Sequence, residues 1–201
     1  PDVINWNQDA PGAVGNFSIN SSPAFEDEPI PGIPGDEGSN NFIAAEVLTF
    51  IEFPAGLHRL GVNSDDGFRV TSGSSPRDLA GLRLGVFDGG RGAADTVFSV
   101  VVSAAGVYPI RLIWYEGDGG ANLEFFSINP ANGQRVLVND RANPAALKAY
   151  RRFTGTTRPY ARSAFPLPAS VNVNPSAAIS VELLDQSAKV VQSSIQLSIN
   201  G

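Results

Sequence analysis

Short runs in which every second residue is apolar, separated by glycine and proline, constrain this chain more than any other feature. Between residues 107 and 116, Tyr108, Ile110, Leu112 and Trp114 occupy alternate positions. Alternate side chains of a strand point to one face, so this pattern is typical of a β-strand with one buried side. Glycine (21 residues) and proline (15 residues) are plentiful, which favours many short strands joined by tight turns. The sequence therefore predicts an all-β protein.

Comparable runs predict the other strands of the chain. Between two of them, Asn132-Gly133 is a turn signal that we expect to close a hairpin. A short helix is expected at residues 143–150, with Asn143 as its N-cap. Residues 1–41 hold acids, prolines and glycines without an apolar period, and predict a long loop that wraps the packed body. The predicted strands are residues 44–53, 57–62, 67–71, 96–103, 107–116, 121–128 and 134–140.

Two units and a connection are expected along the chain. Residues 1–155 hold the strands of an all-β domain, and residues 156–165 are expected to be a linker. Two further strands are predicted at 178–185 and 193–201, and their sequence pattern resembles that of bacterial immunoglobulin-like modules. Such a sandwich needs roughly 100 residues, so residues 166–201 predict only part of one. We expect its missing strands to come from the chain that follows or from a neighbouring subunit.

Composition excludes several kinds of site and partner. A net charge of −6 argues against a nucleic-acid-binding protein, which should show a basic face. There is no cysteine and His58 is the only histidine, so a His–Cys zinc site is excluded and a histidine-based triad is not expected. His58 itself is expected at the border of the core. No apolar run reaches the length of a membrane span, and the absence of methionine indicates a piece of a longer protein.

Residues 63–70, NSDDGFRV, place two acids and a glycine between two predicted strands. Adjacent carboxylates repel each other, and in a regular strand Asp65 and Asp66 would point to opposite faces. One interpretation is a turn in which Asp65 caps backbone amides. The other is a cation site, where an ion removes the repulsion. Residues 88–95, DGGRGAAD, hold two more acids without the spacing of an EF-hand, and we interpret them as a glycine-rich surface loop.

Four elements then follow one another in a specific order: the strand GLHRLGV, the turn SDDG, the strand AGVYPI, and a glycine-rich loop leading into NLEFF. In this order and spacing the chain resembles the carbohydrate-binding domain family named after the anthrax protective antigen. Yeast flocculins, bacterial adhesins and many glycosidases contain such domains. The resemblance covers residues 40–130 and extends over 1–155. His58 stands where an aromatic is usual, and residues 71–92 are longer and richer in glycine than the family's hairpin.

The resemblance implies a protective-antigen-type β-sandwich and, in sugar-binding members, a calcium ion held by the two acids of the turn. In those members the peptide between the acids is cis, which would bring both carboxylates to one side. Calcium takes about six to eight oxygen ligands, so a second loop must contribute, and residues 115–124 occupy its place. The implied metal ligands are Asp65, Asp66, Glu116, Gly117 and Asp118, and the implied carbohydrate contacts are Asp65, Asp66, Tyr115, Asp118 and Asn122.

Three functions stay open on the sequence alone. The first is a non-catalytic module of a secreted, multidomain bacterial protein that uses calcium to bind a glycan or cell-surface polysaccharide, as adhesins do. The second is a structural or assembly module of the cell surface with the same fold and no sugar site. The third is an enzyme, but nothing in the sequence singles out an acid pair of the kind that glycosidases use, and we do not expect one.

Overall fold

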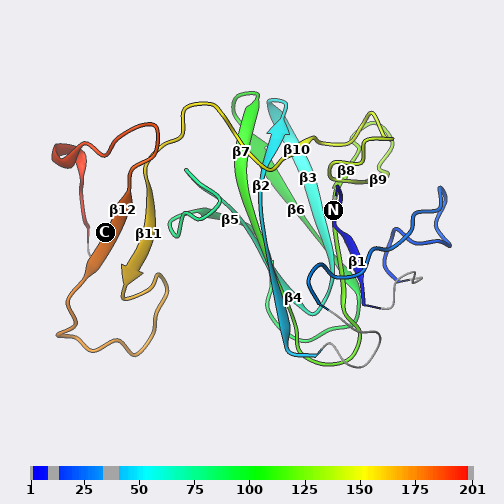
Figure 1. The fold of residues 1–201 in the computed structure, drawn as a ribbon, viewed down its shortest axis with the longest axis horizontal. Helices are drawn as coiled ribbons and strands as arrows, with labels where there is room; N and C mark the ends of the chain where they lie inside the picture. Colours follow the sequence, from blue (N-terminus) through cyan, green and yellow to red (C-terminus); the bar gives the residue numbers. More distant parts are fainter. Residues whose placement is uncertain (1, 9–13, 34–40, 199–201) are drawn as a thin grey trace.

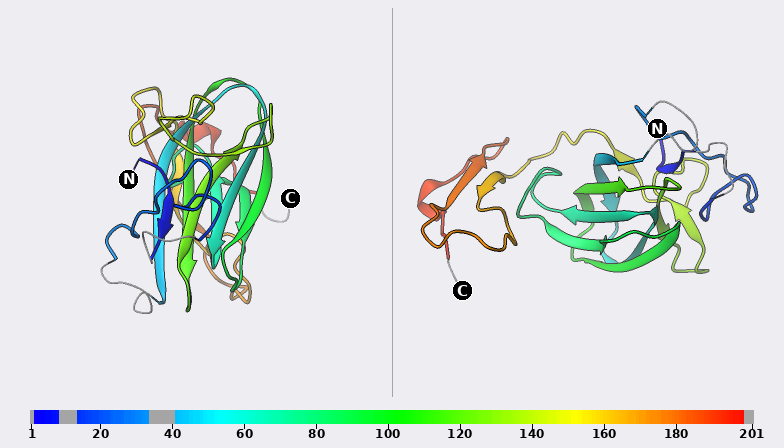
Figure 2. Two further views of the ribbon diagram at one scale, coloured as in Figure 1. Left: turned by 90° about the vertical axis from the view of Figure 1, so that its right-hand side faces the viewer. Right: turned by 90° about the horizontal axis from the view of Figure 1, so that it is seen from below.

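A computed structural model describes residues 2–8, 14–33 and 41–198 of the protein. Two five-stranded antiparallel sheets form a β-sandwich (Figure 1), and Figure 2 shows it from two further sides. The all-β prediction is thereby confirmed. No helix within the described ranges is long and apolar enough to cross a membrane. The strands of the sandwich are β1 (Asn5–Asn7), β2 (Ile43–Phe53), β3 (Gly56–Asp65), β4 (Gly67–Ser72), β5 (Leu82–Phe87), β6 (Ala94–Val102), β7 (Gly106–Glu116), β8 (Asn122–Ile128), β9 (Arg135–Leu137) and β10 (Ala149–Tyr150).

The strand order decides which chain segments meet at each end of the sandwich. One sheet has the order β1-β8-β3-β6, with β9 paired to β8, and the other has the order β10-β2-β7-β4-β5. Consecutive strands β3 and β4 therefore lie in different sheets, and the Asp65–Gly67 turn crosses between them. In the second sheet Gly67 of β4 pairs with Tyr115 of β7. The turn is thus placed next to the end of β7, where Glu116 lies.

The core between the sheets is built from the alternating apolar positions. Ile110, Leu112 and Trp114 of β7 are at most 1% exposed, as their spacing predicted. They pack in one cluster with residues of β3 and β8 in the opposite sheet. His58 is half-buried with its ring edge against Phe53, which confirms its place at the border of the core.

The hairpin predicted at Asn132-Gly133 is confirmed, since β8 and β9 pair on either side of it. The helix predicted at residues 143–150 is wrong. The Asn143 side chain does accept a hydrogen bond from an amide, that of Ala145, but only a turn follows. The chain then pairs with β2 as β10, because the edge of that sheet offers backbone partners that a two-turn helix would leave unused. The polar β1, NWN, lacks an alternating pattern and was not predicted as a strand.

The C-terminal part forms a separate two-stranded sheet, β11 (Tyr160–Phe165) with β12 (Ser180–Leu184), followed by a short 3₁₀ helix, η1 (Gln192–Ser194). β12 confirms the strand predicted at 178–185, whereas β11 falls inside the range expected to be a linker. The strand predicted at 193–201 is wrong over its described part, because residues 195–198 have no strand partner among the described residues. Residues 199–201 lie outside the described residues.

Candidate functional site

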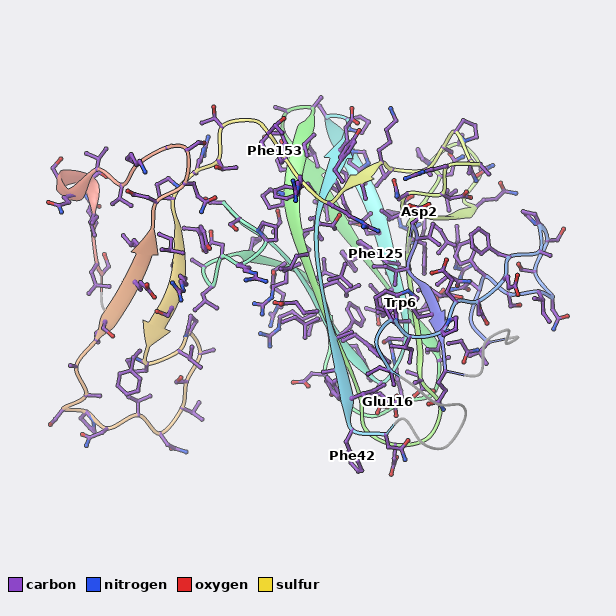
Figure 3. All side chains as sticks on the ribbon, in the orientation of Figure 1. Asp2, Trp6, Phe42, Glu116, Phe125 and Phe153 are labelled. Atoms are coloured by element: carbon purple, nitrogen blue, oxygen red, sulfur yellow. The ribbon has the colours of Figure 1, made fainter. Side chains whose placement is uncertain are left out.

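The turn between β3 and β4 and the end of β7 bring acidic side chains together at one end of the sandwich. The peptide bond between Asp65 and Asp66 is cis, as the resemblance implied. Asp65, Asp66 and Glu116 each place a carboxylate oxygen within 4.8 Å of the others. Figure 3 shows Glu116 at this end of the molecule and Phe42 beyond it at the tip. Two adjacent acids and a third that is distant in the sequence thus converge on one point.

Asp66 is fixed by the backbone of two loops. Its Oδ1 accepts a hydrogen bond from the amide of Arg91 at 2.6 Å, and its Oδ2 accepts one from the amide of Gly117 at 2.9 Å. The Ser64 hydroxyl donates to the Asp66 carbonyl at 2.6 Å. The indole of Trp114 donates to the Asp65 carbonyl at 2.7 Å, so the turn is tied directly to the core. These contacts hold the Asp66 carboxylate and the backbone of the turn in one orientation.

Glu116 differs from Asp66 because its carboxylate is buried and has no hydrogen bond of normal geometry among the described residues. The residue is 2% exposed, since it shares the inward face of β7 with Trp114. Neither carboxylate oxygen has a hydrogen bond of normal geometry to a described residue, although the nearby Asp66 amide lowers the pKa somewhat. Burial, and then the charges of Asp66, Asp65 and Asp118, raise the pKa of Glu116 to about 7. Burial, and then Asp66, raise the pKa of Asp65 to about 6.

The loop after β5, predicted to be a plain surface loop, is part of the site. Arg91 supplies the amide that holds Asp66, and its guanidinium donates to the Ser64 carbonyl and hydroxyl and to the Thr96 hydroxyl. The guanidinium also lies 3.9 Å from the centroid of the Phe87 ring. In the sequence, only the glycines on either side of Arg91 indicated that this segment is a loop. They do not indicate which turn the loop contacts.

A cavity of about 560 Å³ opens beside Asp65 and Asp66, and Glu116 is not among its lining residues. The sequence-predicted residues Gly117 and Asp118 line it together with the two acids of the turn. The carboxylate of Asp118 does not belong to the group whose oxygens lie within 4.8 Å of one another. Phe42 was not predicted as a site residue. The cavity is lined by Phe42, Asp65, Asp66, Gly90, Arg91, Gly92, Gly117, Asp118, Gly119 and Gly120.

The structure does not bring Tyr115 or Asn122 to this cavity. The Tyr115 hydroxyl accepts a hydrogen bond from the Gly89 amide, and its ring covers Gly67 on the outer face of the sheet. Asn122 is 1% exposed, and its amide nitrogen donates to the Trp6 carbonyl. Tyr115 therefore contacts the loop after β5, Asn122 is bonded to β1, and neither side chain lines the cavity.

No protein-family model and no curated protein match the sequence. Solved structures that are similar to the chain include the following two. One is described as the crystal structure of the PA14 domain of MpAFP antifreeze protein, with 15% identity, coverage of 73% of this chain and 71% of that one, and a TM-score of 0.47. The other is described as a PA14 sugar-binding domain from an RTX adhesin, with 16% identity, coverage of 67% and 73%, and a TM-score of 0.44.

Proposed function

We propose that this protein is a non-catalytic carbohydrate-binding or adhesion module that holds its glycan through a calcium ion. One observation carries the proposal. Asp65, Asp66 and Glu116 converge within 4.8 Å, and Glu116 is buried with no hydrogen bond of normal geometry from the residues that the structure describes. Buried carboxylates are normally paired, hydrogen-bonded or bound to a metal. A divalent cation is the partner that completes this cluster.

The chemistry of the cluster favours calcium among the divalent ions. All the converging side-chain atoms are carboxylate oxygens, and no cysteine exists in the chain, so the ligands suit a hard cation. Asp65, Asp66 and Glu116 would hold the ion. Calcium accepts about six to eight oxygens in flexible geometry, which leaves positions for two neighbouring sugar hydroxyls on the cavity side. Gly117 and Asp118 line that side, in keeping with the ligands that the sequence resemblance implied.

A second function has an observation of its own in its favour. Both carboxylate oxygens of Asp66 accept hydrogen bonds from backbone amides, so this acid holds two loops to the turn without any ion. A structural module of the cell surface would need that fastening and no sugar. Glu116 argues against this alternative, because a carboxylate buried without a partner costs stability and fastens nothing. In either case we propose that the chain works outside the cell as one module of a longer protein.

Calcium titration and glycan binding test the proposal together. The full chain is titrated with calcium and with magnesium in a calorimeter, and then applied to a glycan array with calcium or with chelator. We expect calcium binding that magnesium does not reproduce, and glycan binding that chelator abolishes. Asp65→Asn should lose both, whereas Asp78→Asn, which alters an acid outside the site, should lose neither. A protein that ignores calcium would leave the structural module as the better account.

A further inference from the structure

Phe42, directly before β2, has an aromatic side chain that is almost fully exposed. It is 86% exposed, the highest value among the large hydrophobic residues that the structure describes. Its ring lies at the tip of the sandwich, beyond Glu116 (Figure 3). A single exposed hydrophobic residue is ordinary on a protein surface. Its backbone and its position are not ordinary.

The backbone of Phe42 has a φ of 56°, in the left-handed region. A bulky residue other than glycine or asparagine is rare there, and the conformation costs energy that packing of the ring does not return. What holds it is a hydrogen bond from the Phe42 amide to the carbonyl of Gly117 at 2.8 Å. Gly117 in turn donates its own amide to Asp66. The backbone that carries the exposed ring is therefore bonded to the loop that holds Asp66.

Phe42 also faces a cavity with an unusual lining. Apart from Phe42, the described residues that line it are two acids of the turn, Asp118, Arg91 and five glycines. The glycines add no side chains, so the wall beside the ring stays open. A protein-binding surface normally has a contiguous apolar patch, and this cavity has a single apolar side chain beside charged groups. One aromatic ring next to oxygen ligands matches a small ligand with a polar edge and an apolar face.

We infer that Phe42 is the platform on which a sugar ring lies while its hydroxyls reach the acid cluster. The inference rests on the proposed function and names the class of ligand. It is a pyranoside that has two neighbouring hydroxyls at one edge and a face of C–H groups. C–H groups carry partial positive charge, and they are attracted to the negative face of an aromatic ring. Phe42 then determines specificity for a cyclic sugar over an open-chain polyol with the same hydroxyls.

Three probes test the platform by calorimetry in calcium: methyl α-D-galactopyranoside, methyl α-L-fucopyranoside and galactitol, which has neighbouring hydroxyls but no ring. Phe42→Asn is the main variant, because asparagine tolerates the left-handed backbone and keeps the amide that bonds to Gly117. We expect its affinity for the better glycoside to fall about tenfold, while its affinity for galactitol and for calcium does not change. Phe42→Trp should keep or improve glycoside binding.

Each contrary result has a different meaning. If the Asn variant binds the glycoside as well as the wild type does, the platform is wrong and the proposed function stands. If its calcium affinity falls with its glycoside affinity, Phe42 positions the loop and does not contact sugar, and the inference is overturned. If the wild type binds calcium but no glycoside, the sugar-binding function and the platform fail together, and the cation site alone remains.

Discussion

Two buried glutamates of the sandwich differ in the hydrogen-bond donors that surround their carboxylates. Glu124 is 0% exposed, and its carboxylate accepts hydrogen bonds from the Asn16 amide at 2.7 Å, the Phe17 amide at 2.9 Å and the Asn16 side chain at 2.9 Å. These donors fasten the N-terminal segment to the sheet. Glu116 is also buried, but two other acids lie beside it, and its carboxylate has no hydrogen bond of normal geometry to a described residue. Glu124 thus has its partners within the chain, and we propose that the partner of Glu116 is the cation.

Glu116→Gln should therefore act in opposite directions with and without calcium. In chelator the variant should unfold at a higher temperature than the wild type, because it removes a buried charge and its repulsion by Asp65 and Asp66. With calcium at 100 times its Kd, the wild type should gain about 2.7 kcal/mol, and the variant much less. Thermal denaturation under the two conditions measures this. A variant that is less stable in chelator, yet stabilised by calcium like the wild type, would contradict the assignment of Glu116.

Glu124 predicts a pH dependence of stability. Burial raises the pKa of Glu124 to about 7 from an ordinary 4.5, against the lowering effect of its Phe17 and Asn16 hydrogen bonds. Between these values the folded protein keeps a proton that the unfolded chain releases. The free energy of unfolding should therefore fall as pH rises through this window. Asp65 and Glu116 contribute with the same sign, so urea denaturation of the wild type is compared with Glu124→Gln. Equal slopes in the two proteins would refute the prediction.

The sequence could predict the acids of the site but not the residues that surround them. Asp65 and Asp66 stand out because two acids are adjacent, whereas Glu116 was named because the resemblance implies a second loop at residues 115–124. Arg91 meets Asp66 across 25 positions of the chain, through a loop whose path no local pattern indicates. The exposure of Phe42 depends on a positive φ and on a bond to Gly117, and both are properties of the folded chain.

At the scale of elements, a glycine inside a strand can make room for an aromatic ring of the neighbouring strand to pack against the backbone. Gly61 in β3 pairs directly with Phe126 in β8, and a Cβ at Gly61 would clash with the edge of the Phe126 ring. Phe126 is 0% exposed and packs against Phe17 of the N-terminal segment. Long alternating strands such as β3 were predictable from sequence alone. The two-residue β10 was not, because its pairing is decided by the free edge of β2.

Gly61→Ala should destabilise the sandwich by about 1–3 kcal/mol, since the new methyl group forces the Phe126 ring out of place. Gly106→Ala in β7 is the matched control. Its added Cβ would meet the Tyr108 ring at 3.5 Å, an ordinary contact, and it should change stability by at most about 0.5 kcal/mol. Urea denaturation measures both variants. If the two alanines cost the same, the close approach at Gly61 has no energetic significance.

At the scale of the whole molecule, the two sheet systems differ in how completely they bury their apolar side chains. In the sandwich Leu60, Leu112 and Trp114 are at most 1% exposed. In the C-terminal sheet Val181 and Leu183 of β12 are 46% and 38% exposed. The sequence predicted this contrast, because the second unit has alternating strands and too few of them to form a second layer. The immunoglobulin-like character of that unit stays a prediction.

The C-terminal sheet should accordingly be the least stable part of the chain. An isolated pair of strands is marginal in water, and the hydrogen bond from the Leu79 amide to the Ala161 carbonyl is the one backbone bond that joins this sheet to the sandwich within the described residues. Hydrogen exchange of the full chain should show amides of β11 and β12 exchanging well before those of β3 and β7, because local opening follows the amount of buried contact. Residues 159–201 expressed alone should show no strong protection, whereas residues 1–155 should keep theirs. Strong protection in the monomeric C-terminal fragment would mean that the sheet is complete as it stands, and that no further strands are needed to cover its apolar face.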